Sequence, residues 1–371
     1  MVDLKGQYLG IKDEIDAAIK QCIDTTSFIN GPQVIEFKQG LESYLDVKHV
    51  ITCANGTDAL QLALMALELS AGDEVIVPSF TYVATTEVIA LLGLTAVMVD
   101  VDPDTFNITA AHIKAAITPK TKAIVPVHLF GQCANMEEIV AVANKHNLYV
   151  IEDNAQAIGA TYEFSDGTKK KAGTIGHIGC TSFFPSKNLG CYGDGGAICT
   201  NDDKLGAKLQ MMANHGQERK YVHKYIGVNS RLDTLQAGIL NVKLKYLDQY
   251  SRARSDAASY YDTKLSDLEG IQVPTRNPQS THVFHQYTLL VKNYKRDELK
   301  AFLTTKGIPA MIYYPVPLNE QEAFKNVSRV IGDLAISNML CQSVLSLPIH
   351  TEMNTEIQDY IISAIREFYA K

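Results

Sequence analysis

The sequence predicts an α/β protein built around a mainly parallel β-sheet with helices on both faces. Between about residues 50 and 200, short apolar runs alternate with stretches in which apolar residues recur every three to four positions. The short runs are almost continuously apolar, as expected for strands that are covered on both sides. Four strands are expected in this part of the chain, at residues 73–78, 95–100, 122–127 and 148–153.

Helices are expected between these strands, and the pattern changes towards the C-terminus. The helices are expected at residues 57–69, 85–92 and 135–145. A long helical stretch at residues 234–265 then precedes an apolar strand at 286–291 and a short strand at 309–313. We therefore expect a larger α/β domain with an N-terminal helix at residues 1–240, and a smaller α+β domain at residues 241–371.

The composition is that of a soluble globular protein, with 46% hydrophobic and 20% charged residues. The net charge of −7 comes from interspersed acids and bases, which argues against a nucleic-acid or membrane partner. No run reaches the roughly 18 apolar residues of a membrane helix, and the first residues do not resemble a signal peptide. Seven cysteines without paired spacing indicate reduced thiols. We expect a cytoplasmic protein.

Polar and aromatic residues follow the expected strands, and ligands bind at the carboxyl edge of such sheets. Gly56 and Thr57 open a helix, whose free N–H groups and dipole suit a phosphate. An ordinary helix cap is the alternative. Tyr82 follows the strand at residues 73–78, where its ring either stacks on a planar ligand or belongs to the core.

Two further strand ends carry an acid and a lysine. A buried acid is costly without a partner, so Asp153 either pairs with a protonated ring nitrogen or caps a helix. Lys187 lies before a glycine-rich turn, close to Ser182 and Ser186. Desolvation would lower its pKa and free the amine to attack carbonyls; a surface lysine is the alternative. A phosphate cradle, a stacking ring, an acid and an amine are together the parts that pyridoxal phosphate (PLP) requires.

These motifs resemble those of the DegT/DnrJ/StrS sugar aminotransferases. The resemblance covers almost the whole chain and implies a fold-type-I PLP-dependent transferase. It also implies a homodimer whose active sites are shared across the interface. Family members in which histidine replaces the lysine are dehydratases, so Lys187 favours transamination over a dehydratase or lyase reaction. The motifs lie at residues 56–57, 82, 152–156, 182–187 and 229–233.

The resemblance implies a role for each matching residue. Lys187 would bind PLP covalently and move protons, and Asp153 would pair with the pyridine nitrogen. Gln156 would face the ring hydroxyl, and Tyr82 would stack on the ring. The phosphate would be held by Gly56, Thr57, Ser182 and the partner subunit's Asn229.

Residues 183–196 most resemble the enzymes that aminate C3 of UDP-2-acetamido-2-deoxy-3-keto-D-glucuronate in polysaccharide biosynthesis. We expect L-glutamate as the amino donor. Ser186 places a hydroxyl where enzymes for dTDP-3-keto-6-deoxyhexoses typically carry glycine, and Arg231 offers a charge for a sugar carboxylate. The sugar pocket departs from that of the uronate enzymes in that a Gly, a Tyr and a His-Tyr pair are replaced here by Thr26, Phe28 and Tyr313-Tyr314.

Two other functions remain open from the sequence. The first is the same chemistry on a dTDP-linked 3-keto-6-deoxyhexose. The second, from another class, is a PLP-binding regulatory protein without turnover. No metal site is expected, because His282 and His285 lack a third ligand.

Overall fold

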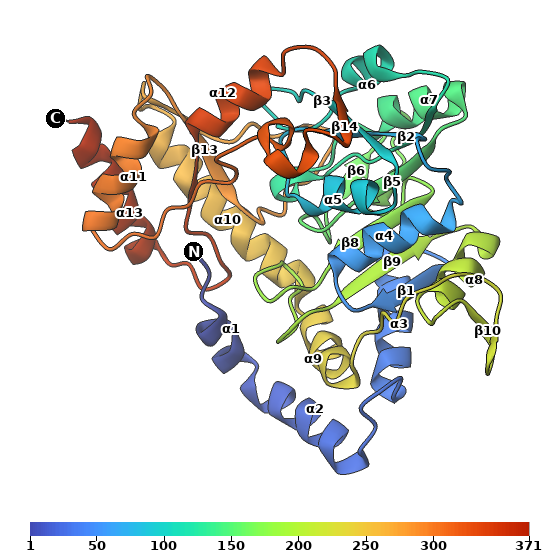
Figure 1. The fold of residues 1–371 in the computed structure, drawn as a ribbon. Coiled ribbons are helices and arrows are strands. Elements are labelled where there is room, and N and C mark those ends of the chain that lie inside the picture. Colours follow the sequence, from blue (N-terminus) through green and yellow to red (C-terminus); the bar gives the residue numbers. More distant parts are fainter. Residues whose placement is uncertain (371) are drawn as a thin grey trace.

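An eight-stranded β-sheet is the central element of the computed structural model, which describes residues 1–370 (Figure 1). β9 runs antiparallel to both of its neighbours, and the other strands run parallel to one another. The expectation of a mainly parallel sheet is therefore confirmed. In spatial order the strands are β1 (His49–Cys53), β9 (Gly196–Thr200), β8 (Ile178–Ser182), β5 (Tyr149–Asp153), β4 (Thr121–Ile124), β2 (Glu74–Pro78), β3 (Thr95–Val99) and β14 (Ser328–Val330).

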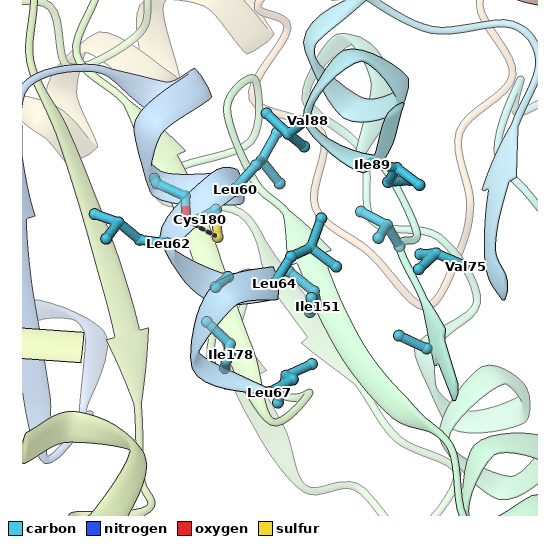
Figure 2. Close-up of a cluster of buried hydrophobic side chains, with 14 of the residues drawn as sticks. Leu60, Leu62, Leu64, Leu67, Val75, Val88, Ile89, Ile151, Ile178 and Cys180 are labelled. Carbon is cyan, nitrogen blue, oxygen red and sulfur yellow. Dashed lines mark hydrogen bonds between the residues drawn. The ribbon is translucent and has the colours of Figure 1, made fainter. Parts of the chain in front are cut away.

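Helices cover both faces of this sheet, which explains why its strands are apolar on both sides. Val75 of β2 points to the face on which Leu60 and Leu64 pack (Figure 2), and Val77 belongs to the same cluster. Ile76 lies between them and points to the opposite face. The first face is covered by α4 (Gly56–Ala66), α5 (Ala84–Leu91) and α8 (Asp203–Met212), and the second by α3 (Pro32–Leu45), α6 (Ala110–Ala116), α7 (Met136–His146) and α9 (Thr234–Leu244).

A second sheet and three of the four helices in the C-terminal part of the chain surround a separate core. Tyr261, Tyr287 and Leu303 belong to this core and are fully buried. β14 leaves this part and pairs with β3, so residues beyond 240 contribute to both sheets. The division into domains at residue 240 remains a prediction. The elements are the antiparallel strands β12 (Ile271–Gln272), β13 (Tyr287–Val291) and β15 (Val344–Leu347), with α10 (Leu247–Leu265), α11 (Arg296–Thr305), α12 (Ala335–Ser343) and α13 (Thr355–Tyr369).

Two expected elements differ from those observed. The helix expected at residues 234–265 is two helices, α9 and α10, which meet at Lys245 and Tyr246. Through this turn α9 packs against the large sheet while most of α10 packs against the C-terminal core. The strand expected at residues 309–313 is a single bridge between Met311 and Ser346. Pro309 begins this segment and cannot donate to a strand ladder.

The N-terminal helices form an arm that packs on α9, as Figure 1 shows at the lower edge of the molecule. Ile15 of this arm contacts Ile239 and Val242. Within residues 1–370, no helix combines the length and apolar character that a membrane span requires. The remaining elements are α1 (Leu4–Gly10), α2 (Lys12–Thr25), the hairpins β6–β7 (Thr161–Glu163, Lys169–Lys171) and β10–β11 (Gln217–Arg219, Val222–His223), and 3₁₀ turns at Leu129–Gly131, Leu318–Glu320 and Glu322–Phe324.

Candidate active site

A cavity of about 620 Å³ lies at the carboxyl ends of β1, β2, β5 and β8. Its volume falls in the range of about 300–1,000 Å³ that is common for small-molecule sites. The C-terminal part of the chain closes one wall with Tyr313 and Tyr314. The cavity is thus where a doubly covered parallel sheet binds its ligands.

The N-terminus of α4 opens into this cavity. Asn55 caps the helix, and its Oδ1 accepts a hydrogen bond of 2.8 Å from the N–H of Asp58. The first helical N–H groups, those of Gly56 and Thr57, need a partner outside the helix. Gly56 lies against the end of β8, where an added Cβ would be 2.7 Å from the Cβ of Ser182. Only glycine permits this close approach, which brings the helix end and the serine together.

A carboxylate occupies the end of β5. Asp153 is 6% exposed, and its Oδ2 accepts a hydrogen bond of 2.7 Å from the hydroxyl of Thr85 on α5. Its Oδ1 accepts a second bond, of 3.2 Å, from the N–H of Ala155. These two donors fix the orientation of the carboxylate.

Lys187 lies in the turn that follows β8 and reaches the same cavity. Its N–H donates to the carbonyl of Phe184 at 2.8 Å, and the side chain of Asn188 donates to the carbonyl of Val283 at 2.8 Å. Burial lowers the pKa of the Lys187 ammonium to about 8, against the opposing attraction of Asp153. A substantial fraction of the amine is therefore uncharged near neutral pH and able to react with a carbonyl.

Gln156 and two tyrosines form the opposite part of the wall. Gln156 Oε1 accepts a hydrogen bond of 2.7 Å from the N–H of Phe130, and its Nε2 donates to the hydroxyl of Tyr314 at 3.1 Å. The rings of Tyr82 and Tyr314 lie 6.2 Å apart. Tyr82 is 56% exposed, so its ring is not a core side chain and its face is available to a planar ligand.

The structure separates the predicted site residues into two groups. Four do not line the cavity: two of them follow α2, and the other two precede α9. Phe28, 46% exposed, accepts a hydrogen bond from the N–H of Thr234, and Thr26 is the exposed C-cap residue that follows α2. Asn229 and Arg231 lie shortly before α9. The ten residues that line the cavity are Gly56, Thr57, Tyr82, Asp153, Gln156, Ser182, Ser186, Lys187, Tyr313 and Tyr314.

The structure adds two residues to the site that the sequence did not place there, Thr85 and His285. Thr85 stands in an apolar helix, and nothing in the sequence links it to Asp153. His285 lines the cavity and is 6% exposed, and its Nδ1 has no partner within residues 1–370. Burial, with the charges of Lys187 and Arg254, holds its pKa well below the usual range. The described residues contain no group of three potential metal ligands.

The cavity has the chemical groups that PLP needs. The N-terminus of α4 and Ser182 offer donors to a phosphate, and the buried carboxylate of Asp153 can pair with a protonated pyridine. Thr81 also lines the cavity, and its buried hydroxyl has no hydrogen-bond partner among residues 1–370, so a polar group remains to be satisfied there. Lys187 supplies the amine. The residues present therefore fit this cofactor.

Comparison with known proteins agrees with this arrangement. The chain is 45% identical to a UDP-2-acetamido-2-deoxy-3-oxo-D-glucuronate aminotransferase of Pseudomonas aeruginosa, over 98% of each chain. It is 45% identical to a pleiotropic regulatory protein of Geobacillus stearothermophilus, over 100% of this chain and 98% of that one. The crystal structure of a DegT DnrJ EryC1 StrS aminotransferase from Brucella abortus superposes with a TM-score of 0.95 and 43% identity, covering 100% of this chain and 99% of the other.

The family match extends over nearly the whole chain. Residues 10–366 match the DegT/DnrJ/EryC1/StrS aminotransferase family. This range contains the large sheet, the cavity at its edge and the C-terminal core. The chain therefore belongs to this family and is a PLP-dependent sugar aminotransferase.

Proposed function

We propose that the protein transfers the amino group of L-glutamate to C3 of UDP-2-acetamido-2-deoxy-3-keto-D-glucuronate, in the cytoplasm, for polysaccharide biosynthesis. The observation that carries the reaction type is the partly buried amine of Lys187, which shares one cavity with the carboxylate of Asp153. The choice of sugar is supported by the relative from Pseudomonas aeruginosa. The hydroxyl of Ser186, beside the reacting amine, supports it further.

The cavity residues divide the work of this reaction. When bound, PLP supplies an aldehyde that condenses with amines and a ring that withdraws electrons. Lys187 Nζ acts as general base and acid, because its lowered pKa lets it accept and return a proton near neutral pH. Asp153, oriented by Thr85, keeps a positive charge on the ring nitrogen. Tyr82 would stack on one face of the ring.

We assign the four residues outside the cavity to the active site of a second copy of the chain. Asn229 would donate to the phosphate, and Arg231 would pair with the sugar carboxylate. Thr26 and Phe28 would contact the sugar. Thr26, Phe28 and Asn229 are exposed and Arg231 is half-buried, which supports this assignment because it leaves these side chains free to reach a partner. The working unit would then be a homodimer with shared sites.

Two alternatives to this function are aminotransfer to a different nucleotide sugar and PLP binding without turnover. The sugar of a dTDP-3-keto-6-deoxyhexose lacks a carboxylate, so Arg231 would have no charged partner on the sugar. The departures at Thr26, Phe28 and Tyr313-Tyr314 from the residues of the uronate enzymes favour this alternative. A regulatory protein without turnover is favoured by the name of the relative from Geobacillus stearothermophilus. The complete set of reactive groups around Lys187 speaks for turnover.

The decisive experiment incubates the purified protein with PLP, L-glutamate and each keto sugar, and measures the amino sugar and 2-oxoglutarate by mass spectrometry. We expect turnover of the uronate and none with Lys187→Ala. Preference for the dTDP sugar would refute the proposed substrate. Covalent PLP binding without any product from either sugar would favour the regulatory alternative. Substantial activity of Lys187→Ala would refute the assignment of the reacting lysine.

A further inference from the structure

A second lysine, outside the cavity, is buried more deeply than Lys187. Lys243 lies near the end of α9 and is 1% exposed. Its Nζ donates a hydrogen bond of 2.8 Å to the carbonyl of Gly190 and lies 4.7 Å from the centre of the Tyr192 ring. Within residues 1–370 no carboxylate forms an ion pair with it. The carbonyl of Gly190 and the face of the Tyr192 ring are therefore the groups that stabilise its charge.

Such a residue is costly to the folded protein. Burial of an ammonium without a counter-ion disfavours the charged form, and burial lowers the pKa of Lys243 to about 8. An apolar side chain of the same length would fill the space without this cost. The cost suggests that the hydrogen bond to Gly190 serves a purpose other than stability.

Gly190 connects Lys243 to the turn that carries Lys187. A Cβ added to Gly190 would lie 2.8 Å from the carbonyl carbon of Pro185 and 2.9 Å from the carbonyl oxygen of Phe184. That same Phe184 oxygen accepts the N–H of Lys187 at 2.8 Å. The peptide held by Lys243 thus packs directly on the backbone that orients Lys187.

We propose that Lys243 is a positioning residue, whose ammonium anchors the turn at Gly190 and thereby holds the Lys187 amine in its partly buried place. This inference rests on the assignment of Lys187 as the reacting lysine. Without the anchor the turn moves, water reaches the Lys187 amine, and hydration restores its charged form. The effect of Lys243 is therefore on the protonation and orientation of Lys187, with no contact to the substrate.

The test measures how fast Lys187 reacts with a trace of acetic anhydride, as a function of pH, in the full-length protein stripped of cofactor. Mass spectrometry of the Lys187 peptide gives the midpoint. For Lys243→Met we expect this midpoint to rise by about one pH unit, which is a roughly ten-fold loss of neutral amine at neutral pH. In the enzyme reloaded with PLP, kcat should fall while KM for L-glutamate stays unchanged.

Lys208→Met is the matched control. The Lys208 side chain is 13% exposed and its Nζ lies 5.3 Å from the centre of the Tyr225 ring, but it is on α8, away from the turn. Its removal should leave the Lys187 midpoint unchanged. Circular dichroism and the thermal transition of each variant establish that it is folded.

An unchanged Lys187 midpoint in folded Lys243→Met overturns the proposal. If that variant does not fold, Tyr192→Leu is tested instead, because it removes the ring beneath the ammonium. Tyr192 is 37% exposed, so its replacement should be tolerated by the fold. An upward shift in Tyr192→Leu supports the proposal, and a midpoint equal to that of the wild type overturns it. Because the labelling needs neither cofactor nor sugar, its outcome is independent of which substrate the enzyme accepts.

Discussion

Replacing Asp153 with Asn is expected to lower the pKa of the Lys187 ammonium below its value of about 8. Burial lowers this pKa from the ordinary value, and the negative charge of Asp153 raises it by a smaller amount. At pH 7 a lysine with a pKa near 8 is neutral in about one molecule in ten, against about one in 3,000 for an ordinary lysine. Asparagine keeps the shape of Asp153 and its bond from Thr85 but removes the attraction, so the neutral fraction increases further.

The assay is the labelling titration of the cofactor-free protein, with Lys187 followed by mass spectrometry. We expect a midpoint near 8 for the wild type and a lower one for Asp153→Asn. Asp194→Asn is the control, because Asp194 lines the same cavity but is exposed to water, which screens its charge. A wild-type midpoint close to that of a free lysine, or an upward shift in Asp153→Asn, would refute the reasoning.

Three further predictions concern stability. Gly56→Ala should destabilise the protein by about 1–3 kcal/mol through overpacking and lower the thermal midpoint by roughly 1–4 °C. Gly10→Ala is the control and should not lower the midpoint, because Gly10 has open space around it. Equal midpoints for the two variants would contradict this prediction. Thr85→Val should lower the free energy of unfolding in urea by about 1.5–3 kcal/mol, because the carboxylate of Asp153 loses a hydrogen-bond donor. Thr86→Val is the control and should leave this free energy unchanged or raise it, because the buried hydroxyl of Thr86 has no partner within residues 1–370. A larger loss of stability in Thr86→Val than in Thr85→Val would contradict the prediction. Burial raises the pKa of all seven cysteine thiols, so the unfolded chain loses thiol protons first and the free energy of unfolding should fall as pH rises above roughly 8.5. The lowered pKa values of Lys187 and Lys243 act in the opposite direction, but these lysines are fewer than the cysteines. An unfolding free energy that rises between pH 8 and 10 under reducing conditions would contradict this prediction.

The strands of the large sheet were predictable because burial on both faces leaves a local signal. Expected and observed bounds agree within one residue for β2, β3 and β5, whose central residues are apolar and buried. β4 begins and ends earlier than expected, since Pro126 follows its observed end at Ile124. The cavity at the strand ends follows from the same topology, which is why Gly56, Asp153 and Lys187 could be named from the sequence.

Contacts between distant segments could not be predicted in this way. Thr85 reaches Asp153 across 68 positions of the chain, and Lys243 reaches Gly190 across 53. Each contact depends on how a helix is placed over the sheet, and no periodicity in the sequence encodes that placement. The sequence favours a structural role for His285 over a metal ligand and does not place it in the cavity, because that position comes from the packing of its segment against the 3₁₀ turn at Leu129–Gly131.

The return of β14 to the large sheet has a consequence for the order in which the protein can fold on the ribosome. β3 is complete once residue 99 has been synthesised, yet its outer edge is paired only by Ser328–Val330, more than two hundred residues later. Throughout that interval the nascent chain presents an open row of N–H and C=O groups beside apolar side chains, a surface that invites pairing with other chains. A chain that stops before residue 328 keeps this edge open permanently. Nonsense mutations that stop the chain between residues 99 and 328 should therefore yield aggregated protein rather than a folded enzyme that lacks only its C-terminal segment.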